Sequence, residues 1–202
     1  MIDLPSIRQR LAGHQGETVT PRRSTRQAAV AVILRDKAGQ TEILFIKRAE
    51  KAGDPWSGQM AFPGGHREGA DPDLKAAAVR ETLEEIGLDL AASEYLGALD
   101  HHYAAPRGPR MDMLIAPHVF VLEGDPSFNL NYEVAEVVWA SLESLAANGL
   151  HDTETLPMAG KPTVFNGYRL AGGHFVWGLT YRMLKDFFLT LNPDWPPPAE
   201  VS

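Results

Sequence analysis

Three glutamates lie within five residues of the chain: Glu81, Glu84 and Glu85. On a helix this spacing gathers three carboxylates within little more than one turn, where they repel one another unless a cation lies among them. Hard divalent cations such as Mg²⁺ accept oxygen ligands of this kind. Arg80, four residues before Glu84, could neutralise or orient that carboxylate. Read alone, the pattern is more typical of a solvated helix face.

A glycine pair lies upstream of these acids, in the run Phe62-Pro63-Gly64-Gly65. Paired glycines let the backbone turn tightly and present a carbonyl near a helix. The Gly65 carbonyl could therefore add an uncharged ligand to the carboxylates. The alternative for the pair is an ordinary turn.

The acids belong to the clearest helix of the sequence, which is predicted over residues 71–86. Asp71 is the expected N-cap, Pro72 suits the first helical position, and Gly87 ends the helix. At about 100° per residue the three glutamates share one side. The opposite side, which we expect to be buried, holds Ala76, Val79, Leu83 and Ile86.

Short strands and few helices are predicted for the rest of the chain. β-rich runs predict strands over 27–34 and 41–46, joined by a turn, and over 59–62, 95–100, 113–122 and 134–139. Helices are expected over 4–11, 141–148 and 177–191. Strands scattered between few helices favour a mixed α/β (α+β) sandwich.

Composition and charge exclude several classes of protein. The 202 residues are 44% hydrophobic, and the net charge of −7 has the wrong sign for holding nucleic acid by phosphate neutralisation. The longest apolar run, 28–34, is far shorter than the roughly 20 residues of a membrane-spanning helix, and residues 1–5 lack a secretory signal's cationic lead. Without cysteine there is no disulfide or thiol nucleophile. We expect a cytoplasmic protein, and a homodimer is left open.

One motif of the chain resembles the Nudix box. It consists of Gly65, Asp71 and the run from Arg80 to Leu88 (Arg-Glu-Thr-Leu-Glu-Glu-Ile-Gly-Leu). That box has glycine, five residues, glutamate, seven residues, then Arg-Glu-apolar-x-Glu-Glu-x-Gly-apolar. This chain has Asp71 for the first glutamate, one extra residue before Arg80, and Thr82 at the first apolar position. The aspartate and the extra residue occur in the branch that resembles coenzyme A pyrophosphatases.

Two further segments are similar to that branch. Gly58 to Gly65 looks like the G-x-x-x-F-P-G-G end of its upstream motif, and Phe175 to Thr180 resembles its C-terminal segment. Asp54, four residues before Gly58, stands where the motif has arginine. The change removes a cation that could meet a substrate phosphate, so it bears on coenzyme A specificity and leaves pyrophosphate chemistry untouched.

The resemblance implies a Nudix-type α/β/α sandwich with a mixed sheet that hydrolyses a nucleoside diphosphate linked to another group. It assigns Glu81, Glu84, Glu85 and the Gly65 carbonyl as ligands of Mg²⁺ or Mn²⁺, with Arg80 as the orienting partner. Such cations bridge the diphosphate oxygens and lower the pKa of a bound water. They also reverse the local sign of charge, which lets an acidic protein bind an anion.

A general base outside the box is also implied, because family members often recruit a further acid. The segment 131–137 resembles the one that supplies it, and the motif match favours Glu133 over Glu136. Glu84 is the next candidate. For either strand residue, an exposed edge glutamate is an equally good interpretation.

Substrate contacts are expected from the breaker-rich connection 100–110, through His101, His102, Arg107 and Arg110. Trp177 is expected in the core, with stacking on adenine as the alternative.

We expect one domain of this family over residues 27–192. An N-terminal extension, 1–26, carries a short helix packed on it, and an irregular Pro-rich tail follows over 193–202. The leading function is hydrolysis of a small-molecule nucleotide, coenzyme A or an acyl derivative, to 4′-phosphopantetheine (or its acyl form) and adenosine 3′,5′-bisphosphate. The alternatives are hydrolysis of ADP-ribose, a nucleotide sugar or a dinucleotide, and a non-catalytic nucleotide-sensing domain. The three intact glutamates argue against the last.

Overall fold

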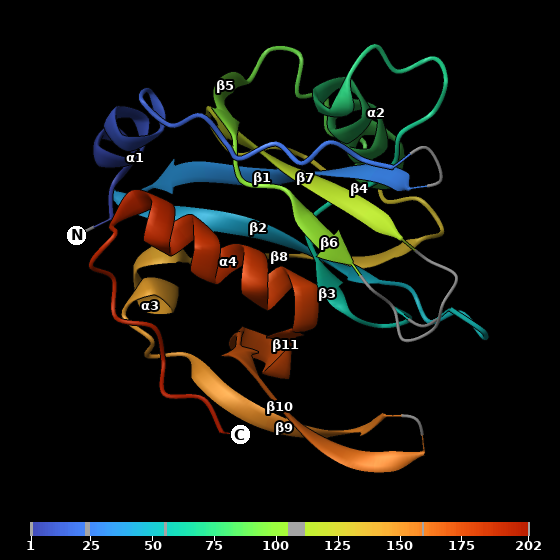
Figure 1. Cartoon of the computed structure of the whole chain (residues 1–202). Coiled ribbons are helices and arrows are strands. Elements are labelled where there is room, and N and C mark those ends of the chain that lie inside the picture. Colours follow the sequence, from blue (N-terminus) through green and yellow to red (C-terminus); the bar gives the residue numbers. More distant parts are fainter. Residues whose placement is uncertain (1, 23–24, 55, 105–111, 159, 202) are drawn as a thin grey trace.

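The computed structural model describes residues 2–22, 25–54, 56–104, 112–158 and 160–201. Its centre is a mixed sheet with helices on both faces (Figure 1), so the predicted α/β/α sandwich is confirmed. The helices are α1 (Leu4–Leu11), α2 (Leu74–Ile86), α3 (Leu142–Ala146) and α4 (Gly178–Leu191). The strands of the main sheet are β1 (Arg26–Lys37), β2 (Gln40–Arg48), β3 (Met60–Ala61), β4 (Gly64–His66), β5 (Glu94–Ala98), β6 (His102–Ala104), β7 (Met113–Leu122) and β8 (Val134–Ser141).

Strand β1 lies at the middle of this sheet. It pairs antiparallel with β2 through the predicted hairpin and antiparallel with β4, and it runs parallel to β7. Its side chains alternate between the two faces, because successive residues of a strand point in opposite directions. Ala29, Ala31 and Ile33 pack beneath α2. Val32 and Leu34 belong to the larger core, which α1 and α4 cover.

A second sheet was not predicted. It consists of three antiparallel strands, β9 (His151–Met158), β10 (Lys161–Arg169) and β11 (Phe175–Trp177), and it extends from the α4 side of the molecule (Figure 1). In β9 and β10 only two residues are buried, so these strands lack the run of apolar residues that marks a strand in a sequence.

Helix α2 begins two to three residues later than predicted. Its N-cap is Asp73, whose side chain accepts a hydrogen bond from the Ala76 amide, so the assignment of Asp71 as the cap was wrong. The Asp71 carboxylate instead accepts from the Glu68 amide and from the Arg80 guanidinium. The helix ends as predicted at Gly87, with φ of 69°.

The buried side of α2 was predicted correctly at Ile86 and wrongly at Leu83 and Glu85. Leu83 is 47% exposed, whereas the side facing the sheet carries Ala77, Ala78, Thr82, Glu85 and Ile86. Small alanines let the helix approach Ala29 and Ala31 of β1 closely, and that approach turns Leu83 outward. Apolar periodicity gives the largest side chains the most weight, and here close backbone packing decides the rotation.

Both ends of the chain pack on this core. Leu4, Ile7 and Leu11 of α1 are buried in the larger core. In the tail, the Trp195 indole donates a 2.6 Å hydrogen bond to the Ala146 carbonyl, and Glu200 accepts one from the Tyr181 hydroxyl. Among the described residues, no helix is long and apolar enough to span a membrane.

The rotation of α2 can be tested by placing one charge on each side of it. Ala78→Asp puts a carboxylate into a fully buried position, so we expect the free energy of unfolding to fall by about 3 kcal/mol or more. Leu83→Asp, at an exposed position, should lower it by less than about 1 kcal/mol. Urea denaturation of the two variants measures both changes. Equal losses would show that the helix is rotated differently.

Candidate active site

The turn that carries Gly64 and Gly65 approaches β1 closely. Gly64 has a φ of 146°, which side-chain-bearing residues rarely adopt, and a Cβ there would overlap the Ala29 carbonyl. The Ala31 amide donates to the Pro63 carbonyl at 2.8 Å and holds the turn against the strand. This fixed backbone forms one wall of a carboxylate cluster.

Glu85 is the most buried member of this cluster, with 2% of its surface exposed. Its Oε2 accepts a hydrogen bond from the Gly64 amide at 2.8 Å. Burial raises its pKa to about 7, and the carboxylates of Glu81 and Glu133 contribute to the rise. The Gly64 amide and Arg48 act in the opposite direction. A nearby positive charge would stabilise the ionised form of a carboxyl group whose pKa is raised in this way.

Glu81 lies one helical turn earlier, against Gly65. A Cβ on Gly65 would come within 2.6 Å of the Glu81 carboxylate carbon, so only glycine leaves this carboxylate its place. Burial raises the pKa of Glu81, and the charges of Glu84 and Glu133 add to the effect. Arg80 lowers it through an ion pair at 3.1 Å.

Arg80 holds the outer side of the cluster together. Its guanidinium donates to both Asp71 oxygens, at 3.1 and 3.0 Å, and to the His66 carbonyl at 2.9 Å. The same group donates to Glu84 at 3.2 Å. The Arg80 hydrogen bond lowers the pKa of Asp71, which therefore stays ionised and fixes the guanidinium. Glu84 itself is largely exposed.

Glu133 reaches the cluster from a different part of the chain. The segment before β8 is tied to the end of α2, because the Asn131 amide donates to the Glu85 carbonyl at 2.9 Å. Asn131 also accepts from the Glu133 amide through its side chain. Glu133 is half-buried and raises the pKa of both Glu81 and Glu85 by charge repulsion.

Glu136, the alternative base, has another partner. Its carboxylate lies 3.3 Å from His174 Nε2, and it is half-exposed at the position opposite Lys47 of β2. Neither Glu81 nor Glu85 has Glu136 among the charges that raise its pKa.

The donors of this cluster suit a hard divalent cation, because they are carboxylate and carbonyl oxygens in a partly desolvated place. A cation between such acids would stabilise their ionised forms. Across the described ranges, no three acidic or histidine side chains already converge as a formed ligand set. Arg80 holds Glu81 and Glu84 to one side, so binding a cation would require these carboxylates to turn inward.

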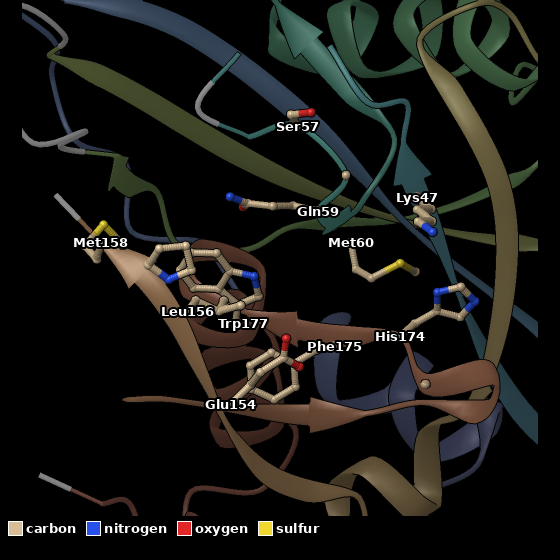
Figure 2. Close-up of a pocket in the computed structure, with 13 residues that line it drawn as sticks. Lys47, Ser57, Gln59, Met60, Glu154, Leu156, Met158, His174, Phe175 and Trp177 are labelled. Atoms are coloured by element: carbon tan, nitrogen blue, oxygen red, sulfur yellow. The ribbon is translucent and has the colours of Figure 1, made fainter. Parts of the chain in front are cut away.

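A cavity of about 430 Å³ lies on the other face of the sheet, between β2, β3 and the second sheet (Figure 2). Lys47 lines it, while the next residue, Arg48, acts on the Glu85 charge on the α2 face. Adjacent Cα atoms are about 3.8 Å apart. The cavity and the carboxylate cluster therefore lie near the same end of β2, on opposite faces of the sheet.

Asp54 is neutralised by Arg48. The Arg48 guanidinium donates to Asp54 Oδ2 at 2.8 Å, and the Trp56 amide donates to Oδ1. Burial works to raise the pKa of Asp54, but these hydrogen bonds and the Arg48 charge hold it below its usual value. Asp54, which stands where the motif has arginine, is thus ionised and paired with the Arg48 guanidinium beside the site.

Of the predicted substrate contacts, the two histidines do not join the cluster. His101 Nδ1 accepts a hydrogen bond from the Val19 amide, and His102 lies 3.5 Å from Asp186 of α4. Burial lowers the pKa of both histidines. Strand β6, which carries His102, lies beyond β7 from β1 and β4. Arg107 and Arg110 lie outside the described residues.

Three residues near the site were missed in the sequence: Lys47, Arg48 and His174. Lys47 and Arg48 lie at the end of an apolar strand. In a sequence, two basic residues at such a position usually indicate a solvent-exposed strand end. His174 follows a glycine pair more than 100 residues later, and only the second sheet brings it to β2. No sequence spacing signals these contacts, because they depend on tertiary pairing.

The fold and the site together define a class: an α/β/α sandwich with a desolvated carboxylate cluster suited to divalent cations. A family model, the NUDIX domain, matches residues 25–158. The chain belongs to the Nudix family and is a Nudix pyrophosphohydrolase that acts on nucleotide-linked pyrophosphates. Enzymes of this family generally use divalent metal ions.

Two relatives and one solved structure illustrate the similarity. An uncharacterized protein of Schizosaccharomyces pombe is 35% identical over 63% of this chain, and the match spans 45% of that protein. The mitochondrial coenzyme A diphosphatase NUDT8 of Homo sapiens is 31% identical over 87% of this chain and 73% of that protein. A MutT/nudix family protein from Enterococcus faecalis shares the fold, with a TM-score of 0.56 at 17% identity, over 96% of this chain and 74% of that one.

The contact between Gly65 and Glu81 gives a test of the cation site. Gly65→Ala should displace the Glu81 carboxylate, because a methyl group would occupy its place. We expect kcat to fall about 100-fold, since a 1 Å misplacement of a catalytic group can cost that much. The rise in melting temperature that Mg²⁺ or Mn²⁺ gives the wild type should shrink, because a weaker ligand stabilises the fold less.

Gly69→Ala is the matched control, because a Cβ at Gly69 has no neighbour within 4 Å. It should keep both the activity and the metal-dependent melting shift. A Gly65→Ala protein with wild-type activity and a wild-type melting shift would remove Glu81 from the cation site.

Proposed function

We propose that this enzyme hydrolyses the pyrophosphate bond of coenzyme A or an acyl derivative. The products are 4′-phosphopantetheine, or its acyl form, and adenosine 3′,5′-bisphosphate. The observation that carries the proposal is the pair of buried Glu85 and half-buried Glu81 at the Gly64-Gly65 turn, in a chain 31% identical to human coenzyme A diphosphatase NUDT8.

Glu81, Glu84, Glu85 and the Gly65 carbonyl are proposed to hold Mg²⁺ or Mn²⁺. When bound, the cation offsets the charge of the diphosphate and lowers the pKa of a water. Arg80 orients Glu81 and Glu84 from the Asp71 side. The Gly64 amide keeps the Glu85 carboxylate directed at the turn. These residues set the geometry in which the diphosphate is attacked.

Glu133 is the proposed general base. Its charge is close enough to raise the pKa of Glu81 and Glu85, and the Asn131 contacts hold its backbone against α2. In this role it removes a proton from the attacking water. Glu136 is less suited, because His174 occupies its carboxylate.

Asp54 favours a second candidate, a substrate without the 3′-phosphate, such as ADP-ribose, a nucleotide sugar or a dinucleotide. Its ion pair neutralises Arg48, so this position offers no net positive charge. The test compares kcat/KM for coenzyme A, 3′-dephospho-coenzyme A and ADP-ribose under one metal condition, with products identified by mass. We expect coenzyme A to be the best substrate. A higher kcat/KM for ADP-ribose would assign the enzyme to the second class.

The base assignment predicts different effects for two neighbouring glutamates. Glu133→Gln should lower kcat by about two to four orders of magnitude, which is the cost of removing a general base. Glu136→Gln should change kcat less than about threefold, because this half-exposed glutamate lies outside the cluster and takes no part in the proton transfer, and any effect through its contact with His174 appears in KM. Steady-state kinetics at saturating metal measures both. Similar small effects would place the base at another residue, with Glu84 next.

A further inference from the structure

The cavity beside the carboxylate cluster has two different ends. Lys47 and His174 lie at one side, and Trp177, Leu156 and Met158 lie at the other (Figure 2). Trp177 is half-buried, and its ring packs on Phe165 at 4.5 Å between centroids. One side of the indole is thus supported by the protein, and the ring also contributes to the cavity lining.

We propose that this cavity binds the nucleoside half of the substrate, with the base stacked on Trp177 and the phosphates contacted by Lys47 and His174. The proposal rests on the proposed function for the identity of the nucleotide. It assigns the other arm of the substrate, with any acyl chain, to a place outside the cavity.

The lining favours a nucleobase over an aliphatic arm. Ser57, Gln59 and Glu154 also line the cavity (Figure 2), and the Glu154 carboxylate is paired with Arg169. An aliphatic chain would need a continuous apolar wall, and these polar side chains interrupt it. A base has a flat face for stacking and polar edges for hydrogen bonds, which matches this alternation.

The basic end lies where phosphates must be if the reaction occurs at the carboxylate cluster. Lys47 precedes Arg48, whose charge acts on Glu85. His174 is positioned by the Glu136 carboxylate at 3.3 Å. A nucleotide with its base on Trp177 and its 5′-phosphate toward Lys47 therefore directs the scissile bond to the end of β2 that both sites share.

The aromatic and histidine part of the cavity lining lies outside the matched family segment. His174, Phe175 and Trp177 all follow residue 158, where the family match ends. Gly167 is paired with Trp177, and a Cβ at Gly167 would come within 2.7 Å of the Phe175 ring. The C-terminal strands thus place a stacking platform next to the common reaction centre.

The experiment measures binding of 5′-AMP and adenosine to the metal-free protein with all 202 residues by calorimetry, so it does not depend on turnover. Trp177→Ala should weaken the binding of both about 5- to 100-fold, the usual cost of losing a stacked base. Trp177→Phe should restore most of the affinity. Lys47→Met should weaken 5′-AMP more than adenosine, because adenosine has no phosphate. Val164→Ala, at an exposed position of β10, is the control.

Three results would overturn the proposal. These are wild-type affinity for 5′-AMP in Trp177→Ala, no binding of 5′-AMP by a folded wild type, and a rate on acyl-coenzyme A that rises with acyl length only while Trp177 is present. If Trp177→Ala fails to fold by circular dichroism, Trp177→Leu replaces it. If the wild type binds 5′-AMP through Trp177 but hydrolyses ADP-ribose rather than coenzyme A, the nucleoside site stands and the proposed substrate fails.

Discussion

The close approach of the Gly64-Gly65 turn to β1 and α2 is the constraint on which the site depends. It lets the Gly64 amide bond to Glu85 and leaves room for Glu81 beside Gly65. Neither carboxylate could lie so deep if the turn carried side chains. Burial then raises the pKa of both acids, because it disfavours their ionised form. A nearby positive charge stabilises that form. Arg80 supplies part of that charge from one side only.

The main sheet separates the carboxylate cluster from the cavity that is proposed to bind the nucleoside. Glu81, Glu85 and Glu133 gather on the α2 face, and the cavity lies on the α4 face, beside the second sheet. Because strand side chains alternate, Lys47 and Arg48 serve different faces although they are neighbours. A substrate that crosses the end of β2 can therefore meet both sites.

Much of the fold and part of the site follow from local sequence pattern. The hairpin of β1 and β2, strand β7 and helix α4 have strong apolar periodicity, and the Glu81 to Gly87 run identifies the reacting helix. The rotation of α2 was mispredicted because small alanines and a buried Glu85 outweigh the exposed Leu83. The second sheet was missed because its strands are half-exposed, and with it the cavity at Trp177.

The carboxylate cluster and the aromatic part of the proposed nucleoside cavity come from different parts of this chain, so similarity in one says little about the other. The carboxylate cluster comes from residues 64–85 and 133, within the matched family segment. Asp54 pairs with Arg48 and thereby changes the net charge beside that cluster. None of the cluster's carboxylates is altered by this. The aromatic wall comes from residues after 158. Sequence changes at Asp54 or in β11 can therefore alter which nucleotide binds while the hydrolytic centre remains the same.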